Sequence, residues 1–196
     1  QKKRKEKKNL KIVTGAPNAM SAFLNVFRKV GGAFEVKEEG IRFYHPGGEL
    51  HSMAMETNVH PGFMTDWQQP LVVALTQAKG ASIVHETVYE ERFGFTNALK
   101  QMGADIVVMR DCVGGAPCRF EGKSYGHSAI ISGPTPLTGA DIEVPDLRGG
   151  FSHIIAALAA KWYFRITFSP LVKSLYPPFI SSVIQLLEIN SLFRVS

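Results

Sequence analysis

The sequence is poor in cysteine and has no long apolar run, and each absence excludes a class of protein. Cys112 and Cys118, its two cysteines, are separated by five residues, and no second pair completes a zinc site. The uncharged stretch 174–187 contains two prolines and is shorter than the about 20 apolar residues that cross a bilayer. We expect a reduced, cytoplasmic protein with incidental thiols, no bound metal and no membrane span.

Several catalytic motifs are also missing. His85 and Glu86 would open a zinc-protease helix, but the second histidine that this motif needs at position 89 is absent. Neither a Walker phosphate loop nor a G-x-G-x-x-G dinucleotide fingerprint occurs. Ser132 and Ser152 lie in no G-x-S-x-G elbow. We therefore expect no cofactor.

The first residues of the chain are basic. Residues 1–9 hold six Lys or Arg and one Glu, a sum of +5 that equals the net charge of the whole chain. The basicity thus belongs to this run and not to a face of the fold, and we expect no nucleic-acid partner. The run is either a solvated end or linker, or a phosphate-binding arm. No signal peptide follows Gln1, and we expect a fragment or a processed product.

Two segments of the sequence, 11–36 and 82–108, repeat one another. Each copy has the pattern of a short strand, a connection, a helix that ends at glycine, and a second strand. The matching positions, all at one constant offset, are Ile12-Val13 with Ile83-Val84, Lys29 with Lys100, Gly32-Ala33 with Gly103-Ala104, and Val36 with Val107.

A second repeat, with its own constant offset, predicts two amphipathic helices that each begin at an aspartate, Asp66 or Asp146. The first helix is expected to end at Lys79-Gly80. In both, apolar residues recur at the spacing of one helical stripe. The stripes are Trp67, Leu71, Ala74, Leu75 and Ala78 in the first helix, and Leu147, Phe151, Ile154, Ile155 and Leu158 in the second.

Together the repeats define a unit in the order helix, strand, helix, strand, strand, which predicts an α/β or α+β fold with helices packed on sheets. Residues 1–9 are then a basic tail or linker. Residues 10–161 hold the later part of one unit, a full unit and the start of a third. Residues 162–196 lack the glycine that ends the helix in the other units, and they lack the further motifs of a unit. We assign them to a divergent segment whose place in the fold the sequence leaves open.

Charged residues recur at equivalent places in these units. Asp66 and Asp146 begin the two helices, Arg92 follows an acidic turn, and Arg148 lies just inside the second helix. Each aspartate alone is explained as an N-cap, worth about 1 kcal/mol. If the units pack around one axis, however, the N-termini of these helices face one shared opening. Helix N-termini and the guanidinium groups of arginine both bind anions there. We expect an anionic small-molecule site with one carboxylate able to act as a general base.

Several short motifs of the sequence resemble those of the UDP-N-acetylglucosamine 1-carboxyvinyltransferase family. The P-x-F-x-T-D helix start occurs at 61–66, the E-T-[VI]-[FY]-E-x-R-F segment at 86–93 and the M-G-A-x-I strand entry at 102–106. The later stretch 137–150, LTGADIEVPDLRGG, is similar to the family's L-x-G-x-x-[VI]-x-x-x-D-L-R-A segment. The resemblance covers about residues 10–161.

The resemblance implies an inside-out α/β barrel of βαβαββ units, three per domain, with buried helices, of which this chain holds an incomplete set. It also implies a reaction. The enolpyruvyl group of phosphoenolpyruvate moves to the 3′-hydroxyl of UDP-N-acetylglucosamine by addition and elimination, with release of phosphate. Such a transferase acts in peptidoglycan precursor synthesis, and hence in cell wall biogenesis, cell shape, the cell cycle and cell division.

The resemblance further implies a role for five residues. Asp66 matches a carboxylate that contacts the sugar and is the candidate base for its hydroxyl. Val88 matches a position whose backbone meets the nucleotide sugar. Arg92 and Arg148 match arginines that hold the carboxylate derived from phosphoenolpyruvate, and Asp146 matches an acid that organises this cationic cluster.

The chain also departs from the family pattern. It has no match for the family's N-terminal Lys-Asn pair, for the other domain with its loop cysteine, or for the arginine of a D-R-G-Y segment. Cys112 and Cys118 do not lie in that loop motif, and Pro145, Gly149 and Gly150 differ from the usual residues around D-L-R. We expect the isolated chain to be inactive and the second domain of a longer parent protein to be its partner.

Two alternatives stay open from the sequence. The related 3-phosphoshikimate 1-carboxyvinyltransferase shares the fold, although its counterpart of E-T-V-Y-E-E-R-F usually reads differently. A non-catalytic polyanion-binding fragment, with residues 1–9 as its arm, is the other alternative.

Overall fold

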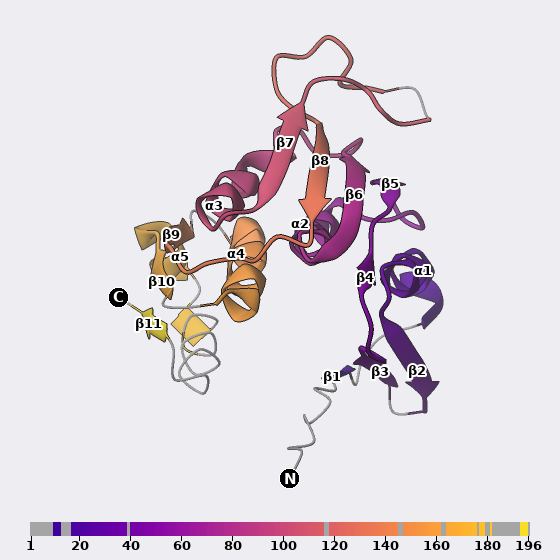
Figure 1. Cartoon of the computed structure of the whole chain (residues 1–196), viewed down its shortest axis with the longest axis horizontal. Helices are drawn as coiled ribbons and strands as arrows, with labels where there is room; N and C mark the ends of the chain where they lie inside the picture. Colours follow the sequence, from indigo (N-terminus) through magenta and orange to yellow (C-terminus); the bar gives the residue numbers. More distant parts are fainter. Residues whose placement is uncertain are drawn as a thin grey trace.

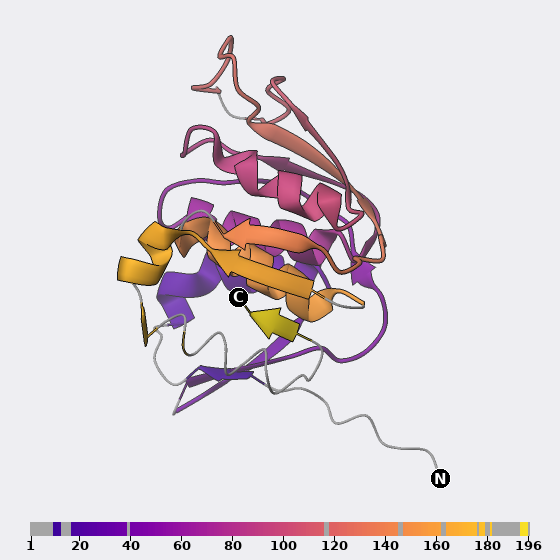
Figure 2. The same ribbon diagram turned by 90° about the vertical axis from the view of Figure 1, so that its left-hand side faces the viewer.

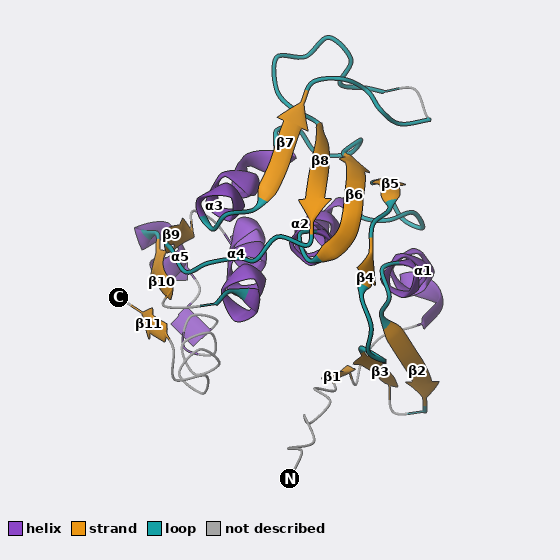
Figure 3. Ribbon diagram, in the orientation of Figure 1, coloured by secondary structure: helices purple, strands orange, loops and turns teal. Residues whose placement is uncertain are grey.

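In the computed structural model, helices alternate with strands that form three separate sheets (Figures 1 and 3). The basic run at residues 1–9 lies outside the described residues. The structure describes residues 10–12, 17–38, 40–115, 118–144, 147–161, 164–175, 177–178, 181 and 193–195.

The first sheet is a small antiparallel one with a helix packed on it. A 3-10 turn, η1, leads into helix α1, whose Leu24 is buried against Ile41 and Phe43 of the sheet. The strand order is β1-β3-β2. The elements are β1 (Leu10–Ile12), η1 (Pro17–Met20), α1 (Ser21–Lys29), β2 (Ala33–Lys37) and β3 (Gly40–Tyr44).

The central sheet has the strand order β4-β6-β8-β7, and β5 also pairs with β6. Strands β4 and β5 run parallel to β6, whereas β8 runs antiparallel to both β6 and β7. The connection from β6 to β7 contains the 3-10 turn η2 and helix α3. The elements are β4 (Leu50–His51), β5 (Ala54–Glu56), β6 (Ala78–His85), η2 (Arg92–Phe95), α3 (Thr96–Gln101), β7 (Asp105–Met109) and β8 (Ser128–Gly133).

The two repeated segments of the sequence, 11–36 and 82–108, belong to sheets that are built alike. The order β6-β8-β7 repeats the order β1-β3-β2, and both hairpins are antiparallel. Val36 of β2 and Val107 of β7 are each 55% exposed, so both copies turn the same position outward. Gly103 has the expected left-handed backbone (φ +93°), but in the first copy this residue is Gly31 (φ +107°) and not Gly32. The turn after α1 thus begins one residue earlier than the sequence match predicted.

Helix α2 (Thr65–Leu75) is buried on several sides, in agreement with the buried helices that the family resemblance implies. It packs against β6, β8 and helix α4 (Leu147–Ala159), and Figure 2 shows both helices in the interior. The expected helix end is wrong, because α2 stops at Leu75, and Ala78, Lys79 and Gly80 already belong to β6.

The predicted apolar stripe of α4 is only partly correct. Phe151 and Leu158 are 51% and 43% exposed. The buried side of α4 includes Ser152 and His153 instead, together with Ile154. The reason is that α4 packs against α2, α3 and β9 at once, so small and polar side chains as well as apolar ones face its neighbours.

The third sheet is parallel, with the order β9-β10-β11. Helix α4 connects the parallel pair β9 and β10 as α2 connects β5 and β6. Ile142, Ile166 and Phe168 of this sheet join the same core cluster as Val72 of α2. The domain boundary at residue 161 stays a prediction. The remaining elements are β9 (Asp141–Val144), β10 (Phe164–Phe168), α5 (Pro170–Leu175) and β11 (Phe193–Val195).

The predicted α/β class is confirmed. The described strands form three open sheets and no closed barrel, which agrees with an incomplete set of units. Within the described part of the chain, every helix is too short or too polar to cross a membrane.

Gly133, at the end of β8, provides a test of how the central sheet packs on the chain that leaves α2. A Cβ at Gly133 would overlap the carbonyl oxygen of Ala78 and lie 2.8 Å from that of Thr76. Because backbone oxygens cannot turn aside, Gly133→Ala should lower the free energy of unfolding by about 1–3 kcal/mol, the usual cost of overpacking. Urea denaturation measures this. Gly94→Ala is the control, since no described atom lies within 4 Å of its Cβ position. Equal stability of the two variants would contradict the packing.

Candidate functional site

The E-T-V-Y-E-E-R-F segment begins where β6 ends and is fixed by a buried carboxylate. Glu86 is fully buried and accepts four hydrogen bonds. The donors are the hydroxyls of Thr57 and Thr65 at 2.9 Å and the backbone N–H groups of Val88 and Tyr89 at 2.8 and 2.9 Å. A buried carboxylate needs such partners to offset its loss of hydration. The four bonds join the chain after β5, the first residue of α2 and the turn after β6.

Thr57 strengthens the same junction from the β5 side. Its hydroxyl oxygen accepts the backbone N–H of Thr87 at 2.9 Å, and its carbonyl accepts the Thr87 hydroxyl at 2.5 Å. Its own N–H donates to the carbonyl of His85 at 2.9 Å. The E-T-V-Y-E-E-R-F segment is therefore held by both backbone and side-chain contacts before any ligand binds.

Arg92 and Asp66 form an ion pair at the end of this segment. Glu91 adopts a left-handed backbone (φ +52°), rare outside glycine, and this turn places Arg92 at the start of η2. Arg92 Nη2 donates to Asp66 Oδ1 at 2.9 Å. The Arg92 side chain is only 6% exposed and that of Asp66 is 58% exposed. A buried guanidinium thus orients a carboxylate that solvent or a ligand can reach.

Two further features describe the surroundings of Arg92: a contact with an aromatic ring and a buried nitrogen without a hydrogen bond. Its guanidinium lies over the ring of Tyr89, 5.2 Å from the centroid, in a cation–π contact. Its Nε is buried and has no hydrogen-bond partner among the described residues. An unpaired buried donor is costly, so further protein or a bound anion would be favoured near it.

The expectation that Asp66 caps α2 is wrong. The helix begins at Thr65 with Met64 in the N-cap position, and no side-chain hydrogen bond of Met64 caps it in the described structure. The Thr65 hydroxyl donates to Glu86. Asp66 lies in the first turn, where a negative charge interacts favourably with the helix dipole, and its carboxylate pairs with Arg92.

The structure brings together three of the five residues expected in the site. Val88 lies between Glu86, which accepts its N–H, and Arg119, which donates to its carbonyl at 3.4 Å. Asp66 and Arg92 are paired across the same segment.

The side chains of the other two expected residues are not described. Asp146 lies outside the described residues. Arg148 belongs to α4, which packs against α2 and η2, but its side chain is not described. Their roles stay predictions.

Comparison with known proteins shows the family. The family model of EPSP synthase (3-phosphoshikimate 1-carboxyvinyltransferase) matches residues 7–183. The chain belongs to the EPSP synthase family.

Its relatives include UDP-N-acetylglucosamine 1-carboxyvinyltransferases. The chain is 52% identical over 176 residues to that of Protochlamydia amoebophila, covering 89% of this chain and 38% of the relative. It is 46% identical over 142 residues to that of Chlamydia trachomatis serovar D, covering 72% of this chain and 32% of the relative. The chain thus spans about a third of the length of these curated relatives.

Solved structures agree with this fold. The enolpyruvyl transferase NikO from Streptomyces tendae matches with a TM-score of 0.58 at 23% identity, covering 72% of this chain and 29% of that structure. EPSP synthase from Acinetobacter baumannii matches with a TM-score of 0.54 at 19% identity, covering 76% of this chain and 32% of that structure. At these identities the likeness concerns the fold alone.

A second polar cluster, which the sequence analysis missed, lies where β6, β8 and the β7–β8 loop meet. His85 Nδ1 lies 2.8 Å from the hydroxyl of Ser128, which donates to the carbonyl of Asp111 at 2.5 Å. Burial lowers the pKa of His85, and the nearby His127 lowers it further. His127 Nε2 lies 3.3 Å from Cys112 Sγ. The sequence signal that could have revealed this cluster is the long connection between β7 and β8. The first copy of the repeat has only a short connection between β2 and β3.

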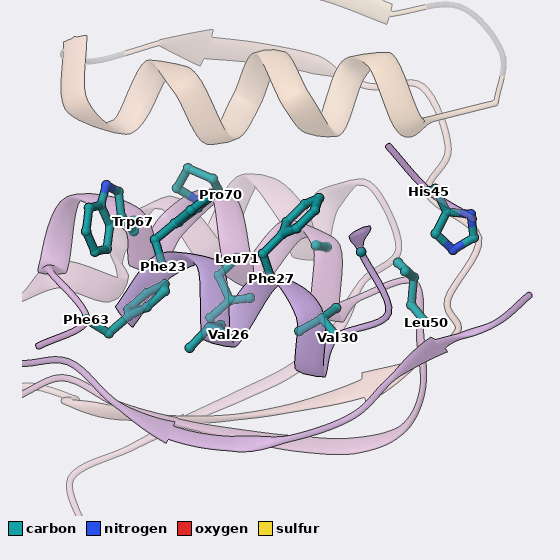
Figure 4. A pocket seen from close by; sticks show the side chains of 12 residues that line it. Phe23, Val26, Phe27, Val30, His45, Leu50, Phe63, Trp67, Pro70 and Leu71 are labelled. Atoms are coloured by element: carbon teal, nitrogen blue, oxygen red, sulfur yellow. The ribbon is translucent and has the colours of Figure 1, made fainter. Parts of the chain in front are cut away.

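An apolar pocket of about 370 Å³ lies between α1 and α2 (Figure 4). The ring of Trp67, the residue after Asp66, packs edge-on against Phe23 and Phe63, with centroids 5.4 and 5.5 Å away. The pocket offers almost no polar atoms, so it positions the start of α2 and does not provide the chemistry. Its lining is Phe23, Val26, Phe27, Val30, Gly32, His45, Leu50, Phe63, Trp67, Pro70, Leu71 and Ala74.

The junction around Glu86 can be tested by removing one hydroxyl. Thr57→Val keeps the shape of the side chain but leaves Glu86 and the N–H of Thr87 each short of one hydrogen bond. We expect the free energy of unfolding to fall by about 1–3 kcal/mol, the cost of leaving buried polar groups unsatisfied. The control is Thr167→Val on β10, since the described contacts of that half-buried threonine include no side-chain hydrogen bond. A Thr57 variant as stable as the control in urea would show that the junction contributes little.

Proposed function

We propose that this chain is part of an enzyme that transfers the enolpyruvyl group of phosphoenolpyruvate to the 3′-hydroxyl of UDP-N-acetylglucosamine. The observation that carries the proposal is the accessible carboxylate of Asp66, oriented at 2.9 Å by the buried guanidinium of Arg92. The proposal is also supported by the 52% identity of this chain to a relative named UDP-N-acetylglucosamine 1-carboxyvinyltransferase.

In this proposal Asp66 is the catalytic base. It takes the proton of the 3′-hydroxyl while the hydroxyl oxygen forms a bond to C2 of phosphoenolpyruvate and a proton is added at C3. Loss of a proton from C3 and cleavage of the bond between C2 and the phosphate oxygen then release inorganic phosphate. Arg92 holds the Asp66 carboxylate in one orientation, which is what a general base needs to meet a positioned hydroxyl.

The other site residues would bind and orient the substrates. The backbone of Val88, fixed through Glu86, would meet the nucleotide sugar. Arg92 and Arg148 would hold the carboxylate of the enolpyruvyl group, because guanidinium groups pair with carboxylates in two-point fashion. Asp146 would organise this cationic cluster. Positioning by groups that are already fixed lowers the entropy cost of bringing two substrates together.

The proposal places the chain in peptidoglycan precursor synthesis in the cytoplasm, and through it in cell shape and cell division. The rest of the site would come from a second domain of a longer parent protein, which supplies groups that this chain lacks. The isolated chain would then release no phosphate from phosphoenolpyruvate, with or without UDP-N-acetylglucosamine. Sugar-dependent release of phosphate by the isolated chain would contradict this.

Shikimate 3-phosphate is the alternative acceptor, because the matching family model is that of 3-phosphoshikimate 1-carboxyvinyltransferase. An assay of the full-length parent with both acceptors separates the two. Phosphate release with UDP-N-acetylglucosamine and none with shikimate 3-phosphate is expected, and the reverse would replace the proposed substrate.

The role of Asp66 can be tested in the full-length parent protein with Asp66→Asn. The amide keeps the size of the side chain but cannot accept the proton, so kcat should fall by about 10²–10⁴-fold. The KM for UDP-N-acetylglucosamine should change much less. Steady-state phosphate release measures both constants.

The control for this variant is Glu49→Gln. It also changes a carboxylate in an ion pair, 3.1 Å from Lys79, but both side chains are about two-thirds exposed and neither lies in the proposed site. Its kcat should equal that of the unchanged protein. A thermal melt of both variants shows whether loss of the Arg92 pair unfolds the protein. An Asp66→Asn variant that is folded and fully active would refute the role of Asp66 as base.

A further inference from the structure

The loop between β7 and β8 is an insertion relative to the chain's own repeat. In the first copy, residues 38–39 separate β2 from β3, whereas in the second copy residues 110–127 separate β7 from β8. Figure 1 shows the described part of the second connection extending beyond the ends of β7 and β8. Loops above about 12–15 residues without secondary structure are uncommon, and they usually have a function.

The loop brings together three side chains of types that can bind a metal ion. The ligand atoms of Cys112, Cys118 and His127 all lie within 4.8 Å of one another, with 3.3 Å between Cys112 Sγ and His127 Nε2. The His127 side chain is buried, at 1% exposure of the residue. Its other nitrogen, Nδ1, lies 3.4 Å from the carbonyl of Tyr125. A proton on Nδ1 that faces a carbonyl leaves Nε2 as the free ligand nitrogen, which is the usual orientation of a histidine bound to a metal.

We propose that Cys112, Cys118 and His127 form a Zn²⁺ site that fixes the β7–β8 loop. Two thiolates and one imidazole suit zinc, whereas Mg²⁺ and Ca²⁺ prefer oxygen ligands. With three protein ligands, a water molecule occupies the fourth position of the tetrahedron. On binding, each thiol releases its proton to solvent. No metal was expected from the sequence because it has no second cysteine pair. The third ligand is a histidine that the hairpin brings close to the cysteines.

The backbone around the three ligands is held in place by other contacts. The N–H of Gly115 donates to Glu56 Oε1 at 2.6 Å, and the hydroxyl of Ser128 donates to Asp111, the neighbour of Cys112. Phe120 is 1% exposed, and its ring lies 5.8 Å from that of His127. Because both ends of the loop are anchored, the ligands need little reorganisation to bind an ion.

A metal ion would use all three side chains, whereas a disulfide would use only the two cysteines. A disulfide would leave the buried imidazole of His127 next to Cys112, and the contact that orients this imidazole, without a role.

The zinc site also has a structural consequence, because Arg119, next to Cys118, donates to the carbonyl of Val88. An ion at the loop would hold Arg119 against the E-T-V-Y-E-E-R-F segment. The metal site itself does not depend on the proposed function.

The test is a titration of the reduced, metal-free chain with Zn²⁺, followed by isothermal calorimetry. We expect one Zn²⁺ per chain and protection of both thiols from Ellman's reagent. No other thiol contributes to the Ellman signal, because the chain contains only these two cysteines. Co²⁺ should give a sulfur-to-metal charge-transfer band in the same chain.

Three variants sharpen this result. Cys112→Ser and Cys118→Ser should each weaken Zn²⁺ binding by more than the roughly tenfold to hundredfold that loss of an outer-shell partner costs. His127→Gln should do the same while both thiols remain, and the serine variants keep the test valid if this buried position fails to fold. His51→Gln, an exposed histidine on β4, should bind as the unchanged chain does.

Two outcomes would overturn the proposal. One is Zn²⁺ binding by the reduced chain that is no tighter than binding by the Cys112→Ser/Cys118→Ser double variant. The other is a reduced chain that binds no Zn²⁺ but forms the Cys112–Cys118 disulfide in air, which would assign the pair to redox chemistry instead.

Discussion

The buried carboxylate of Glu86 is the interaction on which the rest of the site depends. Its four donors come from the chain after β5, the first residue of α2 and the turn after β6, so one side chain fixes the relative position of three segments. Asp66 follows one of these donors directly, and Arg92 follows the turn that contains two others. The ion pair between Asp66 and Arg92 therefore has its geometry set by the hydrogen bonds of Glu86. A polar network of this kind is effective only when every member is satisfied.

The repeated architecture explains how one scaffold can carry two kinds of site. The order β1-β3-β2 and the order β6-β8-β7 are the same small sheet built twice. The central sheet shares one core cluster with α2 and α4, whereas Leu24, Ile41 and Phe43 form a separate cluster at the first sheet. Differences between the copies are concentrated in the connections, where changes disturb the core least. The turn between β6 and α3 supplies Arg92, which pairs with Asp66 of α2, and the β7–β8 loop carries the cysteines and His127. Arg119 links the two through the carbonyl of Val88.

Much of this could be predicted from the sequence because it depends on short-range patterns. The match between segments 11–36 and 82–108 correctly indicated two copies of one strand–helix–strand pattern. The family motifs around Asp66 and Arg92 indicated that these side chains lie close together, and the structure pairs them. What failed depended on tertiary contacts. Asp66 has a cap-like sequence context, yet it pairs with an arginine 26 residues away along the chain. The cluster of Cys112, Cys118 and His127 escaped notice because strand pairing, not sequence spacing, brings the histidine to the cysteines.

The most direct test of the central claim is a crystal structure of the full-length parent protein with UDP-N-acetylglucosamine bound. The account predicts that the 3′-hydroxyl of the sugar lies within hydrogen-bond distance, about 2.6–3.2 Å, of the Asp66 carboxylate. It also predicts that Asp66 remains paired with Arg92 and that the nucleotide sugar contacts the backbone at Val88. A nucleotide sugar bound elsewhere, with Asp66 facing only Arg92 and solvent, would contradict the assignment of this site.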